Sequence, residues 1–229
     1  MNRLLRYLFT VQYDYRDRRD KHDAHRENSH ELDLRLGVNL HSDWMLSARG
    51  GYLSFGSDTP GITLSPANRD HTPFLGAMLE YDHLDSASVP RNGWRGIFDL
   101  TQNGGFLGGD GDFVTAQFDL RRYQSLAHRH GLVLFTFASL QSGRVGGDLP
   151  VYRDFHIGDT NTVRGWESGA RQGKNQFINT VEYRYDLLHP RLFRVRRYSL
   201  YYGLQLAAFA DMGTAWSEGG DFTRNVTAG

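Results

Sequence analysis

The 229-residue chain contains no cysteine and only 6 prolines, and it has no excess of either charge, with 26 basic and 26 acidic residues. Without cysteine, disulfides, thiolate metal sites and thiol catalysis are excluded. Zero net charge removes the electrostatic basis for binding nucleic acid, so we expect none. The chain also lacks a long uncharged apolar run, which excludes a membrane-spanning helix. Arg6 interrupts the apolar stretch near the N-terminus, so residues 1–9 predict no export signal.

Glycine and aromatic residues are abundant by contrast. The chain has 26 glycines and 13% aromatic residues. Both are above ordinary usage, and together they favour an all-β chain with many turns.

Apolar and polar residues alternate strictly along residues 31–40, which is the period of a β-strand. The apolar set is Leu32, Leu34, Leu36, Val38 and Leu40, and the opposite set is Glu31, Asp33, Arg35, Gly37 and Asn39. The same alternation runs through 112–122 and 177–187. In all three segments one face is apolar and the other is largely charged or polar.

The whole chain predicts about nine strands of about ten residues or more, longer than is usual in soluble β domains. The less regular segments are 6–17, 43–56, 73–85, 92–103, 130–142 and 199–215. Clusters of turn residues separate them, and short connections alternate with long ones.

Long strands with one apolar face fit two architectures. A soluble sandwich or barrel, which would act as a binding module, turns that face inward, whereas an outer-membrane barrel turns it toward lipid. The polar faces carry arginine and carboxylates, and lysine occurs only at Lys21 and Lys174. This chemistry suits an enclosed, hydrogen-bonded lumen. Aromatic residues near strand ends, such as Trp44 and Trp94, suit an interfacial girdle, so the pattern favours an antiparallel transmembrane barrel.

One segment, residues 150–186, carries a family resemblance. It contains Val163-Arg164-Gly165-Trp166 with Gly158 upstream, and Thr180-Val181-Glu182-Tyr183 follows in the next expected strand. Residues 209–216, FADMGTAW, end with a D-x-G-x-x-W pattern. These features, in this order, resemble the BamA/TamA family of outer-membrane proteins, also called bacterial surface antigens. With the Asp82–Gly93 hairpin upstream, the resemblance covers residues 73–216, although Asp159 replaces a family glycine.

The motif also has a physical reading. A guanidinium inside a barrel lumen is costly unless carboxylates pair with it. Glu182 and Asp211 fall on the inward faces of their strands, so we expect Arg164 to pair with one or both and to pin the loop 143–173 inside the barrel. The family resemblance implies the same contact. We further expect Gly165 to allow close backbone approach and Trp166 to pack on the lumen wall.

Several other groups of residues suggest chemistry less strongly. The histidines in 22–25 and 128–130 lie on expected loops, and zinc sites need three or four placed ligands, so no metal is predicted. Glu80, Asp82 and Asp85 fit a hairpin, and no nucleophile motif is present, so we predict no enzyme activity. The glycine-rich stretch 104–111 is expected to be a turn. A basic cluster between the last two strands fits anionic headgroups, a partner protein or a solvated turn equally well; its members are Arg191, Arg194, Arg196 and Arg197.

The resemblance implies a barrel of about sixteen strands preceded by periplasmic POTRA repeats. We find about nine strands and no such repeat, so we expect residues 1–229 to form one partial barrel domain, an internal piece of a larger protein that lacks the POTRA repeats and the final strands.

The function implied is insertion and assembly of proteins in the outer membrane, most simply that of a Gram-negative cell, with no cofactor. Expected partners are the lipid bilayer and, through the missing regions, unfolded outer-membrane proteins and periplasmic assembly subunits. Alternatives are a two-partner-type secretion pore or the barrel anchor of a passenger domain. A barrel-borne hydrolase is a weaker third class.

Overall fold

A computed structural model describes residues 7–19, 26–160, 162–195, 197–217 and 227–228. Nine long strands make up most of it: β1 Tyr7–Arg19, β2 Arg26–Asn39, β3 Trp44–Ser57, β4 Arg69–Leu84, β5 Gly93–Gly104, β6 Asp112–Ala127, β7 His130–Gln141, β10 Asn175–Val195 and β11 Tyr198–Trp216. The short elements are the strands β8 Phe155–Ile157, β9 Arg171–Gly173 and β12 Thr227–Ala228 and the 3-10 turns η1 Gly105–Leu107 and η2 Val151–Arg153. None of the helices in the described residues is long and apolar enough to cross a membrane.

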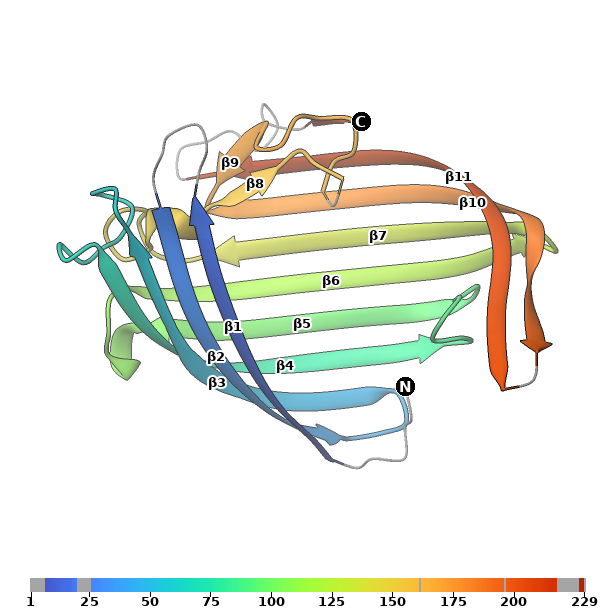
Figure 1. Ribbon diagram of the computed structural model, residues 1–229, viewed down its shortest axis with the longest axis horizontal. Helices are drawn as coiled ribbons and strands as arrows, with labels where there is room; N and C mark the ends of the chain where they lie inside the picture. The colour runs from blue at the N-terminus through green and yellow to red at the C-terminus, as the bar shows by residue number, and fades with distance from the viewer. Residues whose placement is uncertain (1–6, 20–25, 161, 196, 218–226, 229) are drawn as a thin grey trace.

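The long strands form one curved antiparallel sheet in which each strand pairs with the next along the chain (Figure 1). The single skip is from β7 to β10, because β8 and β9 pair with each other as a separate small sheet inside the intervening loop. Within the described residues the sheet is open, with β1 at one edge and the two-residue β12 at the other. The nine predicted strands are all present, and the fold is an incomplete antiparallel outer-membrane barrel.

The sheet reverses the usual distribution of side chains. Leu36 is 62% exposed and Leu100 45% exposed, whereas Asp99 is 3% and Asn103 is 4% exposed. Charged side chains pair across the polar face: Arg35 with Glu80, and Arg49 with Asp33 and Asp99. A soluble sandwich would bury its leucines against a second sheet, so that alternative is wrong. The polar face lines the lumen and the leucines face lipid.

The two ends of the sheet differ in their connections. At one end the strands are joined by 40–43, 85–92, 128–129 and 196–197, and at the other by 20–25, 58–68, 105–111 and 142–174. Bacterial barrels have short turns on the periplasmic side and longer loops outside the cell. The end with the short turns is therefore the periplasmic end, and the loop 142–174 starts from the extracellular end.

Aromatic side chains mark the periplasmic end, as a membrane interface requires. Trp44 packs on Tyr81 with ring centroids 4.7 Å apart, and the Arg122 guanidinium lies 4.9 Å from the Trp94 ring centroid. Both tryptophans remain about two-fifths exposed, at 41% and 40%. Their exposure fits an aromatic girdle that contacts headgroups.

Two of the turns expected from the sequence are present, and the basic cluster lies elsewhere than expected. The 104–111 stretch is a turn, with η1 between β5 and β6. Asp85 accepts the backbone N–H of Arg91 at 2.9 Å, which places it in the β4–β5 hairpin as expected. The basic cluster was expected between the last two strands, but Arg191 and Arg194 lie within β10, which continues to Val195.

Candidate functional site in the inward loop

The loop between β7 and β10 folds back onto the sheet as a small hairpin. β8 and β9 pair from Phe155 with Gly173 to Ile157 with Arg171. Gly158, the first residue after β8, has φ of 103°, and a Cβ there would lie 2.1 Å from the Glu167 carbonyl oxygen. Only glycine fits this position, so the loop conformation is built into the sequence.

Arg164 makes the central polar contact between the loop and the sheet. Its Nε and Nη2 donate to the two Asp211 oxygens at 2.6 and 2.8 Å, and its backbone N–H donates to Asp211 Oδ2 at 3.1 Å. Nη1 lies 3.4 Å from Glu182 Oε2. This is the contact predicted from the sequence, and its two carboxylates come from adjacent strands, β10 and β11.

The charges in this contact are largely shielded from solvent. The Asp211 side chain is 0% exposed, that of Glu182 is 15% and that of Arg164 is 27% exposed. A bidentate guanidinium–carboxylate pair is the strong form of ion pair, and removing one partner leaves the other charge buried without compensation. The hydrogen bonds that Arg164 donates to Asp211 raise the pKa of Arg164 above its ordinary value. Arg164 therefore stays charged and holds the loop.

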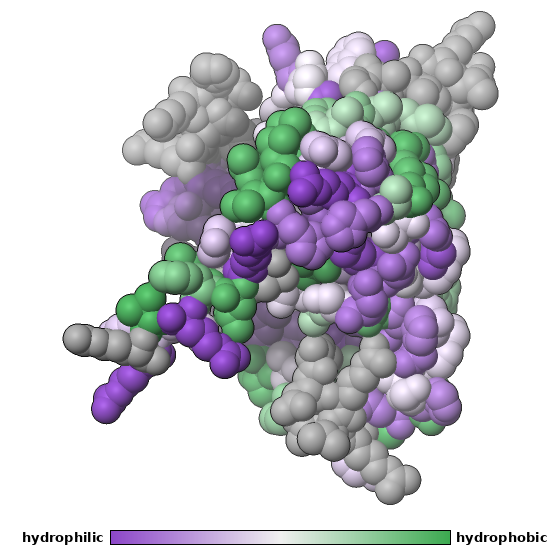
Figure 2. All heavy atoms as spheres, turned by 90° about the vertical axis from the view of Figure 1, so that its right-hand side faces the viewer, coloured by the Kyte–Doolittle hydropathy of each residue, from purple (hydrophilic) through white to green (hydrophobic). Residues whose placement is uncertain are grey.

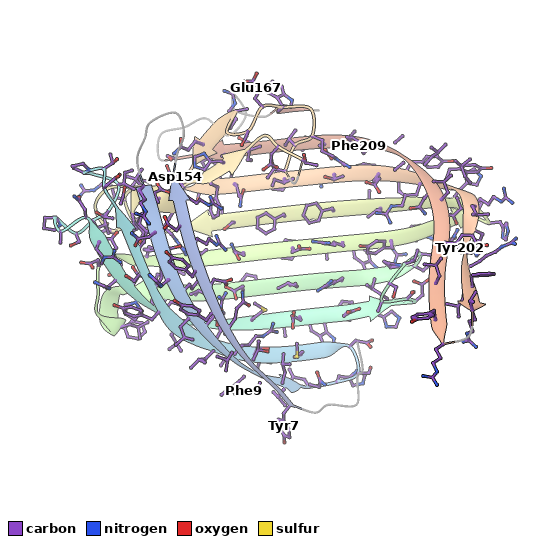
Figure 3. The ribbon with its side chains drawn as sticks, in the orientation of Figure 1. Tyr7, Phe9, Asp154, Glu167, Tyr202 and Phe209 are labelled. Carbon is purple, nitrogen blue, oxygen red and sulfur yellow. The ribbon has the colours of Figure 1, made fainter. Side chains whose placement is uncertain are left out.

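Phe209 adds a contact that the sequence analysis missed. The Arg164 guanidinium carbon lies 3.3 Å from the centroid of the Phe209 ring. Phe209 pairs directly with Glu182 and lies two residues before Asp211, so all three share the inner face of β10 and β11. Phe209 lies on β11 and Glu167 in the loop (Figure 3). The spacing of two residues was the signal that could have identified this cation–π partner.

Val163, the residue before Arg164, makes the apolar contact of the loop. Val163 and Ile157 are 0% exposed and pack in one cluster with Ile178 and Ala215 of the sheet. A Cβ added to Gly213 would lie 2.7 Å from Val163 Cγ2. Gly213 therefore leaves the space that Val163 fills, and this pair of residues was also missed from the sequence.

One expectation about the motif is wrong, the role of Gly165. Nothing lies within 4 Å of a Cβ added to Gly165, so close backbone approach is not its role. Its φ of 89° is the reason for glycine, because other residues are strained there. Trp166 is 43% exposed, and Val163 is the residue of the motif that is buried against the strands.

The two ends of the loop are tied together by Lys174. Its ammonium group donates to the Gly143 carbonyl oxygen at 2.7 Å, and the residue is only 6% exposed. A lysine buried to this degree requires hydrogen-bond partners. Lys174 thus closes the neck of the loop where it leaves the sheet.

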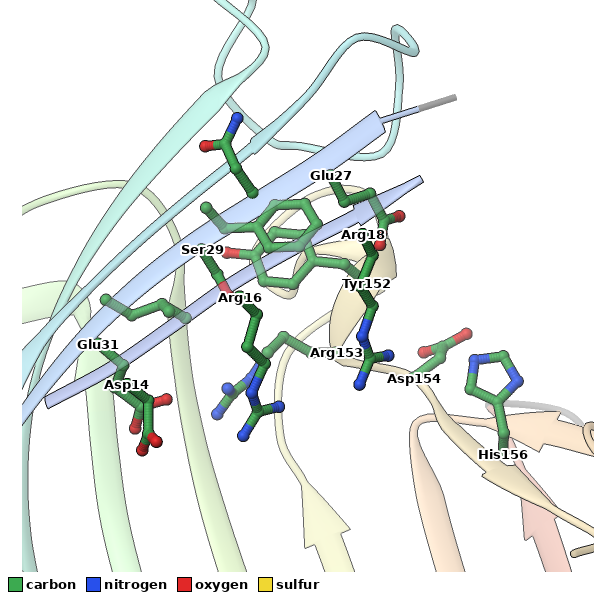
Figure 4. Close-up of a pocket in the computed structure, with 13 residues that line it drawn as sticks. Asp14, Arg16, Arg18, Glu27, Ser29, Glu31, Tyr152, Arg153, Asp154 and His156 are labelled. Atoms are coloured by element: carbon green, nitrogen blue, oxygen red, sulfur yellow. The ribbon is translucent and has the colours of Figure 1, made fainter. Parts of the chain in front are cut away.

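The η2 segment of the loop contacts the strands near the β1 edge of the sheet. Tyr152 stacks on Phe55 of β3 with ring centroids 3.7 Å apart. Burial raises the pKa values of Tyr152 and Asp154 and lowers that of Arg153. A cleft of about 310 Å³ separates this segment from β1 and β2, and charged residues of both sides line it (Figure 4). The inner face is thus polar where the loop does not fill it.

No group of three potential metal ligands occurs in the part of the chain that the structure describes. The histidines of residues 22–25 lie outside the described residues. The His130 ring bonds to the Tyr183 hydroxyl, and the His128 ring stacks at 6.0 Å on His189. Of the carboxylates considered for acid–base chemistry, Glu80 pairs with Arg35. The arrangement around Arg164 can hold a loop against two strands.

Comparison with known proteins gives a family match over nearly the whole chain: residues 3–228 match the Omp85 superfamily domain. Among curated proteins, the outer membrane protein assembly factor BamA of Nitratidesulfovibrio vulgaris strain Hildenborough is 33% identical over 157 residues, which are 62% of this chain and 18% of that protein.

Solved structures show the same fold. The crystal structure of BamA from Haemophilus ducreyi lacking POTRA domains 1–3 superposes with a TM-score of 0.73 at 14% identity, over 95% of this chain and 50% of that one. CdiB from Acinetobacter baumannii gives a TM-score of 0.64 at 14% identity, over 97% and 40%. The chain therefore spans half or less of the length of these relatives.

Proposed function

Because this chain belongs to the Omp85 superfamily, we propose that it is the loop-holding segment of a barrel that inserts or assembles other proteins in the outer membrane. The BamA-related members of this superfamily are outer-membrane barrels of Gram-negative bacteria, and the chain has that fold and that location. The observation that carries the proposal is the bidentate contact of Arg164 with Asp211, reinforced by Glu182.

The contact suits such a role because it joins three segments. Arg164 belongs to the loop, Glu182 to β10 and Asp211 to β11, so one guanidinium fixes the loop to both strands. Arg184 also binds Glu182, at 2.6 Å, and holds that carboxylate in position. A loop fixed inside the lumen sets the shape of the inner face that a client polypeptide meets. The proposed clients are unfolded outer-membrane proteins, and the proposed partners are the bilayer and periplasmic assembly subunits. The proposal needs no cofactor, nucleic acid or covalent chemistry.

The test is Arg164→Ala in the full-length protein, with Arg164→Lys as a second variant that keeps the charge but loses the bidentate geometry. Arg144→Ala, in the same loop and with an exposed residue, is the control. We expect each Arg164 variant to reduce assembly of an outer-membrane protein into lipid vesicles by at least tenfold, the alanine variant more than the lysine variant. Heat-modifiable migration on gels checks that the barrel is folded. Normal assembly by a folded Arg164→Ala protein would contradict the proposal.

A second candidate is a secretion pore of the two-partner type, which the charged inner face and the remaining cleft favour, since an exported polypeptide needs a hydrated passage. Release of an exported partner protein, with no insertion of outer-membrane proteins, would select this candidate. A barrel that anchors a passenger domain is the third, and it would show neither activity when the passenger is removed.

A further inference from the structure

The end of the β10–β11 hairpin extends well beyond the rest of the sheet. β10 pairs with β7 only as far as Tyr185, opposite His130, whereas its pairing with β11 continues to Val195 opposite Tyr198. Residues 187–195 therefore pair on one side only, over about 30 Å of strand. Beyond the end of β7 the two strands bend away from the common strand direction (Figure 1). This extension, residues 187–206, is called the periplasmic hairpin below, because it lies at the end with the short turns.

The free edge of the periplasmic hairpin faces the side of the sheet that β7 occupies, so a strand that pairs with β11 does not cover it. Isolated two-stranded hairpins are only marginally stable in water. An element of this length therefore needs a surface to pack on.

The two faces of the periplasmic hairpin differ in character. One face carries the cross-strand pairs Phe193 with Leu200 and Val195 with Tyr198. These four side chains are 55%, 61%, 49% and 80% exposed, respectively. Arg194 and Ser199 form the next pair and point to the opposite face. The outer end of the hairpin is thus amphipathic, whereas nearer the sheet Arg191 lies on the face of Phe193 and Leu192 lies on the face of Arg194. In Figure 2, which views this end of the sheet, hydrophobic and hydrophilic residues lie side by side on the exposed surface.

The charges of the hairpin are all of one sign. Residues 187–206 contain four arginines and no aspartate or glutamate. Arg191 and Arg194 lie in β10, and Arg197 lies in the turn before β11. An amphipathic element with exposed aromatic residues and only positive charge complements an anionic lipid surface.

The free edge is a poor site for docking an additional strand. The β10–β11 register shifts twice, between Asp186 and Leu188 and between Leu188 and Arg191. Pro190 lies within the second of these shifts and has no backbone N–H to donate. Bulges, proline and positive charge are the devices by which edge strands avoid pairing with other chains. These features favour a lipid surface over an extended polypeptide.

We propose that the periplasmic hairpin lies on the periplasmic leaflet of the outer membrane and binds anionic phospholipid headgroups through Arg191, Arg194 and Arg197, with its aromatic face in the headgroup layer. The site goes beyond the proposed assembly function and does not depend on it. It depends only on the barrel being in the membrane, so a protein that fails the assembly assay can still bind lipid in this way.

The test uses the full-length protein in nanodiscs with an environment-sensitive fluorophore on Val195→Cys, a position that reports on the aromatic face. The 229 residues contain no cysteine, so the label is unique within them. One disc contains only phosphatidylcholine, and the other also contains phosphatidylglycerol at about one lipid in three. We expect the label to be shielded from the neutral quencher acrylamide in the anionic disc and accessible to it in the zwitterionic disc.

The matched variant is Arg191→Gln/Arg194→Gln/Arg197→Gln, and the control Arg16→Gln/Arg18→Gln/Arg144→Gln removes the same charge at the extracellular end. Each hairpin arginine should contribute about fivefold to the ratio of shielded to accessible label, and the control variant should behave as wild type. Heat-modifiable migration checks folding, and the comparison of wild-type protein in two lipids needs no arginine variant. Equal shielding in both discs would overturn the proposal, as would shielding that appears only when an unfolded outer-membrane polypeptide is added.

Discussion

At the scale of single residues, the loop is fixed by one polar and one apolar contact that lie next to each other in sequence. Arg164 binds Asp211, and Val163 fills the space above Gly213, two residues further along β11. The polar contact fixes the orientation of the loop, because a bidentate pair forms in only one geometry. The apolar contact excludes water from its surroundings. The two together explain why an acid, Asp211, is followed by a glycine, Gly213, on the inner face of β11.

The contact at Gly213 makes a prediction of its own. Gly213→Ala should destabilise the loop, because the added Cβ would lie 2.7 Å from Val163 Cγ2. Overpacking of this kind costs about 1–3 kcal/mol. In the double variant with Val163→Ala the cost should be smaller than the sum of the two single changes. Denaturant unfolding in detergent measures it, with Gly96→Ala as the control, since a Cβ there would have its nearest contact at an ordinary 3.6 Å. Equal stability of Gly213→Ala and Gly96→Ala would contradict this prediction, because it would show that the loop accommodates the added Cβ without loss of stability.

At the scale of elements, Lys174 is expected to control how often the loop opens. Lys174→Met keeps most of the side-chain volume but removes the hydrogen bond to the Gly143 carbonyl. Leaving that oxygen without its donor costs about 1–3 kcal/mol, which corresponds to a rise of about 5-fold to 150-fold in the opened population. Limited proteolysis within residues 143–173 reports this opening. Arg144→Met, at an exposed position nearby, is the control, and cleavage at the same rate in both variants would refute the role of Lys174.

The elements show what the sequence could and could not predict. The nine long strands were predictable because apolar and polar residues alternate along them, with a period of two that is clear in β2, β6 and β10 and less regular in the other six. β8 and β9 are three residues each, too short for a period to be visible. β10 was predicted to end at 187, because Pro190 and the arginines interrupt the alternation, although pairing with β11 continues to Val195.

The candidate site was partly predictable for a related reason. The Arg164 contact followed from the motif and from the face on which each acid falls. The roles of Phe209 and Gly213 depend on where a loop more than 40 residues away along the chain packs, as the 47-residue separation of Arg164 and Asp211 illustrates. Local periodicity holds no information on such packing, and this is also why the role of Gly165 was misjudged.

At the scale of the whole molecule, the reversed sheet gives the last prediction. Leu100 of β5 is 45% exposed on the outer face. Gln117 of the neighbouring β6 is on the inner face, where its Nε2 lies 3.4 Å from Ser139 Oγ. An arginine on the lipid face of a barrel costs about 2–4 kcal/mol near the middle of the bilayer, while lumen positions tolerate charge. Leu100→Arg should therefore reduce folding into lipid vesicles, and Gln117→Arg should fold nearly as the wild type does. Heat-modifiable migration measures both, and equal folding of the two variants would contradict the assignment of the faces, because the cost arises only where the charge meets hydrocarbon.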